Sequence, residues 1–99
     1  MPTFVETEPT IAPGIMDQLE ESLDSPWVVI LYNDDWHPID QVILQIQKAT
    51  GYTEEKAQWI TYEAHITGRA VTYTGNLEEC ERVARILRDI KLQVETDKA

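Results

Sequence analysis

The strongest constraint on the fold is the segment from Trp27 to Pro38, WVVILYNDDWHP. It begins with an uninterrupted apolar run, Trp27 to Tyr32, and a short run this rich in Val and Ile is typical of a buried strand. Asn33, Asp34 and Asp35 follow at once, and all three side chains carry acceptor oxygens. We therefore expect a core strand that brings acceptors to one edge of the fold, where they could hold a positively charged group.

The next two segments are predicted to be helices. The first runs from about 38 to 49, because Pro38 suits a first helical turn and Gly51 suits a helix end. Its apolar residues recur at helical spacing, as Ile39, Val42, Ile43 and Ile46. Thr53 is a suitable N-cap for the second helix, which Gly68 ends. His65 falls in the last turn of that helix.

The remainder predicts a strand, a helix and a strand. Residues 69–74 alternate and are rich in β-prone types, and Asn76 with Glu79 forms a capping box at the start of a helix. That helix buries one face, which includes Cys80 as a core thiol. Residues 91–95 alternate again and are expected to form the last strand, with a frayed end at 96–99. The order β-α-α-β-α-β predicts an α/β two-layer sandwich with three helices on one face of a three-stranded sheet.

Length, charge and cysteine content exclude several classes of protein. A chain of 99 residues is one domain, and its net charge of −10 argues against nucleic-acid binding. No apolar run is long enough to span a membrane. The single cysteine fits a reducing, cytosolic compartment, and no His or Cys spacing suggests a metal or cofactor site.

The first 25 residues differ from the rest. They contain six acids and no Lys or Arg, which predicts a flexible acidic extension preceding a core domain at 26–96. Such an extension is either a solvating tail or an arm that touches a partner.

Two readings of Asn33, Asp34 and Asp35 remain open from the residues alone. Asn and Asp favour turns between elements for local backbone reasons. A protonated α-amino group, however, offers three N–H donors, which a carboxylate, an amide oxygen and an imidazole can satisfy together. Catalysis is not expected, because the two acids are neighbours in sequence and no nucleophile or metalloprotease motif is present.

Two stretches resemble the ClpS family, the adaptors of bacterial and plastid Clp proteases. These are WVVILYNDDWHPIDQVILQIQKATGY, followed by EEKA, and AHITGRAV. The combination N-D-D-aromatic-x-P with a later H-x-x-G-[KR]-A carries the resemblance, which covers about residues 26–79. It implies a small fold with an antiparallel sheet, similar to the C-terminal domain of the ribosomal stalk protein, in a bacterial cytoplasm rather than a plastid stroma.

The resemblance also implies a function and a set of site residues. ClpS proteins grip the N-terminal residue of N-degron substrates, typically Leu, Phe, Tyr or Trp, and pass them to the AAA+ unfoldase ClpA or ClpC. By position, Asn33, Asp34 and His65 would bind the α-ammonium; Asp35 and His37 the first peptide units; Ile39, Val42, Thr61 and Ala64 the first side chain; and Trp36, Glu78 and Arg82 the unfoldase.

This chain departs from the family pattern at several of these positions. Thr61 stands where a large apolar residue is usual, and His37 stands in place of Thr. The sequence alone assigns His37 most simply as a helix cap or a surface residue. These departures leave one alternative open, a ClpS-like interaction module that modulates the unfoldase without reading N-termini.

Overall fold

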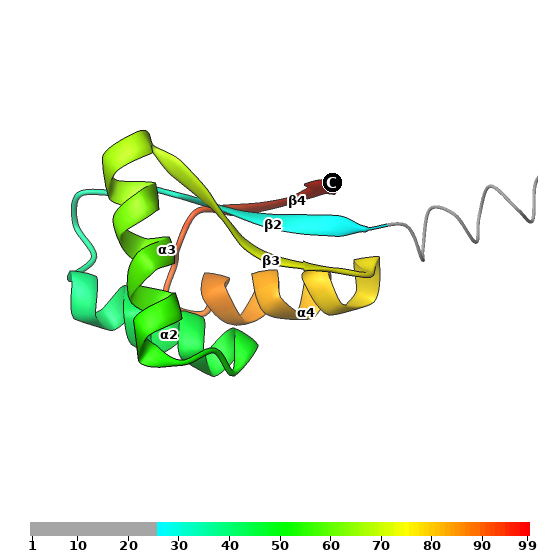
Figure 1. The fold of residues 1–99 in the computed structure, drawn as a ribbon, viewed down its shortest axis with the longest axis horizontal. Helices are drawn as coiled ribbons and strands as arrows, with labels where there is room; N and C mark the ends of the chain where they lie inside the picture. Colours follow the sequence, from blue (N-terminus) through cyan, green and yellow to red (C-terminus); the bar gives the residue numbers. More distant parts are fainter. Residues whose placement is uncertain (1–25) are drawn as a thin grey trace, which may run out of the picture.

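The computed structural model describes residues 26–99, which form three strands and three helices. The elements are β2 (Trp27–Tyr32), α2 (Ile39–Thr50), α3 (Glu54–Thr67), β3 (Arg69–Gly75), α4 (Leu77–Arg88) and β4 (Val94–Lys98). Their order is the predicted one, and the α/β two-layer fold class is confirmed (Figure 1). The acidic extension expected at 1–25 lies outside the described residues.

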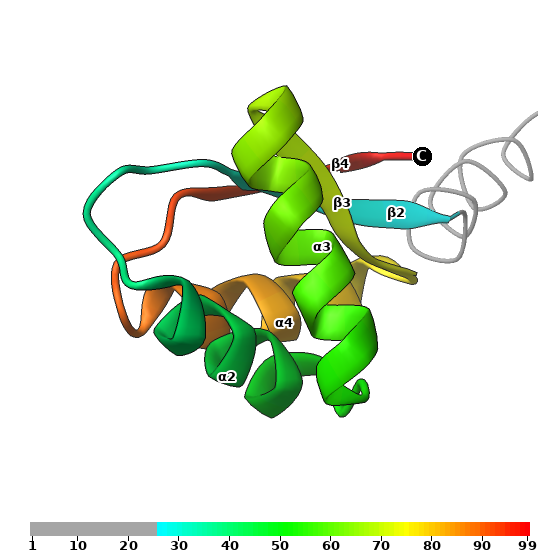
Figure 2. The same cartoon turned by 60° about the vertical axis from the view of Figure 1, so that its left-hand side comes forward.

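The sheet has the order β3-β2-β4, and both pairings are antiparallel. The strand at its centre is β2, as its apolar run predicts, with Val29 and Leu31 buried on the inner face. The three helices lie on one side of this sheet (Figures 1 and 2). Helix α4 packs directly on the strands, whereas α2 packs on α3 and α4 and lies farther from the sheet.

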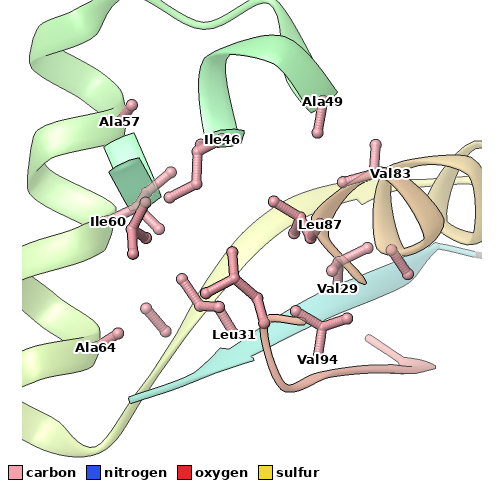
Figure 3. Close-up of a cluster of buried hydrophobic side chains, with 14 of the residues drawn as sticks. Val29, Leu31, Ile46, Ala49, Ala57, Ile60, Ala64, Val83, Leu87 and Val94 are labelled. Atoms are coloured by element: carbon pink, nitrogen blue, oxygen red, sulfur yellow. The ribbon is translucent and has the colours of Figure 1, made fainter. Parts of the chain in front are cut away.

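Side chains from both layers meet in one apolar core (Figure 3). Val29 and Leu31 come from β2, Ile46 from α2, and Val83 and Leu87 from α4, and each is at most 2% exposed. Cys80 belongs to the same core, and burial raises the pKa of its thiol, so it is a packing residue as predicted.

The helix ends follow the predicted signals. The Thr53 side chain accepts a hydrogen bond from the Lys56 backbone N–H at 3.2 Å, and Asn76 and Glu79 form the reciprocal capping box of α4. Gly51 and Gly68 end α2 and α3 in the left-handed region, with φ of 80° and 97°.

Gly68 allows a prediction about stability. A side chain in the left-handed region costs about 1–2 kcal/mol, although the space around Gly68 is open. We expect Gly68→Ala to lower the free energy of unfolding by about 1 kcal/mol in a urea titration. An unchanged midpoint would mean that the end of α3 relaxes around the new side chain.

The last strand was predicted at the wrong position. Residues 91–95 were expected to form it, but β4 runs from Val94 to Lys98, and residues 96–98 pair with β2 instead of fraying. The alternation of Leu92 and Val94 was misleading because Lys91 adopts a φ of 68° in the turn after α4. Leu92 is buried, but it precedes β4 in the sequence and is not part of the strand.

Candidate functional site

A cavity of about 240 Å³ opens where β2 ends. The loop after β2, the start of α2, the last turns of α3 and the segment before β4 surround it. These segments are distant in sequence, and Figure 2 shows the loop and the segment after α4 descending side by side. The lining residues are Leu31, Tyr32, Asn33, Asp34, Asp35, His37, Ile39, Val42, Thr61, Ala64, His65 and Leu92.

The structure brings together around this cavity all nine residues predicted to contact a ligand. Asn33 and Asp34 from the loop and His65 from α3 line it together, although the sequence separates His65 from the loop by a whole helix. The predicted side-chain pocket, formed by Ile39, Val42, Thr61 and Ala64, lines the same cavity. An arrangement of a few polar groups beside an apolar recess is typical of a small-ligand site.

The apolar side of the cavity comes mainly from two helices. Val42 and Ala64 are buried, while Ile39 is 39% exposed. Thr61 is 5% exposed, and its hydroxyl donates to the backbone carbonyl oxygen of Ala57 at 2.8 Å. Because that hydroxyl proton is bonded within α3, Thr61 adds less polarity to the cavity than its residue type suggests.

Sequence reasoning missed three lining residues, Leu31, Tyr32 and Leu92. The first two were assigned to the strand alone, and Leu92 was assigned to the last strand. Leu92 reaches the cavity because the turn after α4 returns the chain towards the end of β2, where the Tyr32 backbone N–H donates to the Gln93 carbonyl oxygen at 2.9 Å. No local pattern around Leu92 signals this position.

Hydrogen bonds within the loop hold the carboxylate of Asp34. Its Oδ1 accepts from the backbone N–H groups of Trp36 and His37 at 3.2 and 2.9 Å. Its Oδ2 lies 2.7 Å from Nδ1 of His37. Burial raises the pKa of the Asp34 carboxyl, but these hydrogen bonds outweigh burial, so the net pKa lies below its ordinary value. Asp34 therefore fits both interpretations of this segment. It organises a turn, and it presents an ionised carboxylate at the cavity.

The loop is also tied to the end of α3. The backbone N–H of Asn33 donates to the carbonyl oxygen of Gly68 at 3.0 Å. This bond joins the first residue of the acceptor cluster to the residue that ends the helix carrying His65. Asn33 and Asp34 are half-buried, whereas Asp35 and His65 are exposed at the cavity.

His37 is neither a surface residue nor a helix cap, which corrects the assignment from sequence. It is 8% exposed, and the N-cap of α2 is Pro38, without a side-chain cap bond. Its Nδ1 faces Asp34, and its Nε2 contacts the backbone carbonyl oxygen of Ile90 in the turn after α4. These two contacts hold the ring against the protein, in agreement with its burial.

A family model described as "ATP-dependent Clp protease adaptor protein ClpS" matches residues 22–95. This chain belongs to the ClpS family. The resemblance found in the N-D-D and H-x-x-G segments is thereby confirmed across the whole core.

Curated ClpS proteins match this chain at moderate identity. The ATP-dependent Clp protease adapter protein ClpS of Streptomyces coelicolor is 39% identical over 59 residues, covering 60% of this chain and 62% of that protein. The match therefore spans less than two thirds of the Streptomyces relative. The ClpS of Mycolicibacterium paratuberculosis is 34% identical over 79 residues, covering 76% of this chain and 75% of the relative.

A solved ClpS structure has the same fold. The structure of Agrobacterium tumefaciens ClpS2 bound to L-phenylalaninamide superposes with a TM-score of 0.72 at 22% sequence identity. The superposition covers 77% of this chain and 99% of that one. The arrangement of three helices on one face of a three-stranded sheet is thus the ClpS fold.

The residues that the ClpS resemblance assigns to the unfoldase do not form one patch here. Trp36 is 67% exposed on the loop that follows Tyr32. Glu78 and Arg82 lie on the first half of α4. That helix begins at Leu77, shortly after Gly75, which pairs with Trp27 at the opposite end of β2. Trp36 therefore follows the end of β2 that opens on the cavity, whereas α4, the helix of Glu78 and Arg82, begins beside the other end of β2 (Figure 1).

Metal ligation and membrane insertion find no support in residues 26–99. No group of three or more His, Cys, Asp or Glu side chains in that range could hold a metal ion. None of the helices described there combines the length and apolar character that crossing a bilayer requires.

Proposed function

We propose that this protein is an adaptor that binds the N-terminal residue of substrate proteins and delivers them to a Clp unfoldase. One observation carries the proposal: an acceptor corner of Asn33, Asp34 and His65 adjoins an apolar recess in a single cavity. A free chain end has the matching chemistry, a charged amine directly beside its first side chain.

The ligand of the Agrobacterium protein supports this proposal. L-phenylalaninamide has a free α-amine, an aromatic side chain and an amide in place of the carboxylate, so it mimics the first residue of a peptide. The volume of about 240 Å³ lies below the ~300–1,000 Å³ of pockets for drug-sized ligands, which suits one residue. We assign the α-ammonium to Asn33, Asp34 and His65, and the side chain to Ile39, Val42, Thr61, Ala64 and Leu92.

The first peptide units would contact the mouth of the cavity. Asp35 is exposed there and can accept hydrogen bonds from peptide N–H groups. His37 was also expected to contact the peptide, but both of its ring nitrogens face acceptors within the protein. Its proposed contribution to binding is therefore indirect.

The proposed role is binding and not catalysis. The carboxylate of Asp34 is stabilised by hydrogen bonds, and its lowered pKa makes it a weak base. A weak base that stays ionised is well suited to hold an ammonium group. The relatives are likewise named as protease adapters.

The proposed partner is a ClpA-type or ClpC-type unfoldase. Glu78 and Arg82 are exposed on α4 and offer charges of both signs for such a contact. Trp36 lies beside the cavity, far from that surface, and we assign it to the substrate side of the complex. Copurification of Glu78→Lys with either unfoldase would test whether the α4 surface, and not the surface around Trp36, makes this contact.

The proposal is tested by titrating a Phe-initiated peptide and its N-acetylated form. Acetylation removes the charge and two of the three donors, so each lost charge-assisted hydrogen bond weakens binding by about 1.5–3 kcal/mol. We expect at least a hundredfold loss of affinity, measured by calorimetry. Equal affinity for the two peptides would contradict the proposal and favour a module that modulates the unfoldase without reading N-termini.

A further inference from the structure

The two ring nitrogens of His37 each face an oxygen that only accepts hydrogen bonds. Nδ1 lies 2.7 Å from Oδ2 of Asp34, and Nε2 contacts the backbone carbonyl oxygen of Ile90. A neutral imidazole has one N–H and one lone pair, so it could satisfy only one of these acceptors. The side chain is 1% exposed, which leaves little room for water to mediate the second contact. Only the doubly protonated ring satisfies both.

The other neighbours of His37 also favour a positive ring. The Trp36 ring lies over it, with centroids 3.7 Å apart and planes 33° apart, and an aromatic face attracts a cation. The other charged or titratable side chains on these segments carry both signs and are exposed. They are Asp35 in the loop, Asp40 at the start of α2, His65 at the cavity, and Arg88, Asp89 and Lys91 on either side of Ile90.

His37 joins two segments that are 53 residues apart in the chain. The first segment is the loop that carries Asp34. The second is the turn after α4, and Leu92, which follows this turn, lines the apolar side of the cavity. The bond therefore sets the position of the acceptor corner relative to the recess.

We propose that His37, as an imidazolium, is a positioning residue that clasps the amine-binding loop to the turn between α4 and β4. The inference rests on the adaptor function proposed above, because it assigns His37 a role in holding Asp34 for the ligand amine. His37 itself does not touch the ligand amine and acts through Asp34.

The clasp predicts a definite dependence on pH. As the pH rises and the ring loses a proton, a lone pair faces either Asp34 or the Ile90 carbonyl, and one contact breaks. The loop is then released from the turn, and binding weakens. A ring that merely competed with the ligand ammonium for Asp34 would have the opposite effect, because its deprotonation would strengthen binding.

The state of the ring is tested without any ligand by NMR of ¹⁵N-histidine-labelled protein at pH 6. We expect His37 to show two slowly exchanging ring N–H signals. His65 is the internal control, because its exposed ring exchanges protons with water and should show none. A single ring N–H signal from His37, or none, would overturn the clasp.

The positioning role is tested by the affinity of His37→Ala for the Phe-initiated peptide between pH 6 and pH 8.5. We expect the variant to bind about tenfold more weakly than wild type at pH 6, and the ratio to fall towards one as the pH rises. Taking the ratio cancels the effect of pH on the peptide amine and on every other group that the two proteins share. Equal or tighter binding by the variant, or a ratio that grows with pH, would overturn the proposal.

These results separate the clasp from the adaptor function. If the wild type binds the free-amine peptide and His37→Ala binds it equally well, the clasp fails and the adaptor function stands. If the wild type binds neither the free nor the acetylated peptide, the adaptor function fails, and with it the role of His37 in binding. Should His37→Ala not fold, as judged by circular dichroism, the NMR signals of the wild-type ring decide the question.

Discussion

Asp34→Asn is expected to weaken binding of a Phe-initiated peptide by about 10-fold to 150-fold. A hydrogen bond to a charged group contributes about 1.5–3 kcal/mol, and each 1.4 kcal/mol corresponds to a factor of ten in affinity. The substitution removes the negative charge but leaves an amide oxygen that can still accept from the Trp36 and His37 backbone N–H groups. The backbone hydrogen bonds of the turn should therefore remain. The new amide N–H2 would face the His37 ring N–H, so the loss measured by calorimetry reports the charge together with the His37 contact.

Asp40→Asn is the matched control. It makes the same change of charge in the first turn of α2, on an exposed residue that does not line the cavity. We expect its affinity to stay within about twofold of wild type, because exposed charges contribute little at ordinary ionic strength. If both variants lost affinity equally, the acidic surface as a whole would attract the peptide, and Asp34 would have no specific role.

Ala64→Phe is expected to abolish binding of peptides that begin with a large apolar residue. Ala64 is 3% exposed and lies on the side of α3 that lines the recess, so a Phe side chain there would occupy the space of the ligand side chain. The acceptor corner would remain. We expect affinity for a Phe-initiated peptide to fall by at least a hundredfold, since the ligand would lose the burial of a whole aromatic side chain, worth about 1.5–3 kcal/mol, and meet a clash.

Ile66→Phe controls for the added side chain. It lies two residues farther along the same helix, is 79% exposed and does not line the cavity. Its affinity should match wild type, and thermal unfolding should show that both variants are folded. Undiminished binding by Ala64→Phe would place the first side chain of the peptide outside the recess.

The helix ends show how far local signals reach. Thr53, Gly51, Gly68 and the Asn76–Glu79 capping box act within one turn of the chain, and each ends or begins a helix where predicted. The apolar run of β2 likewise predicted the central strand. Val29 and Leu31 form its buried face, and the side chains that alternate with them are half-buried. The predicted position of the last strand was wrong, because pairing with β2, and not alternation in the sequence, decides where β4 begins.

Residue types and spacing predicted the order of elements, because caps, turns and helix faces are local properties of the chain. The resemblance of the N-D-D-x-x-P and H-x-x-G segments to ClpS supplied the family and the residues that gather at the cavity. The tertiary structure alone decided that His37 points inward, that Leu92 completes the recess and that Trp36 lies far from Glu78 and Arg82. Each of these features depends on contacts between segments that are far apart in the sequence. How the layers pack decides which of these contacts form, and no local sequence pattern signals them.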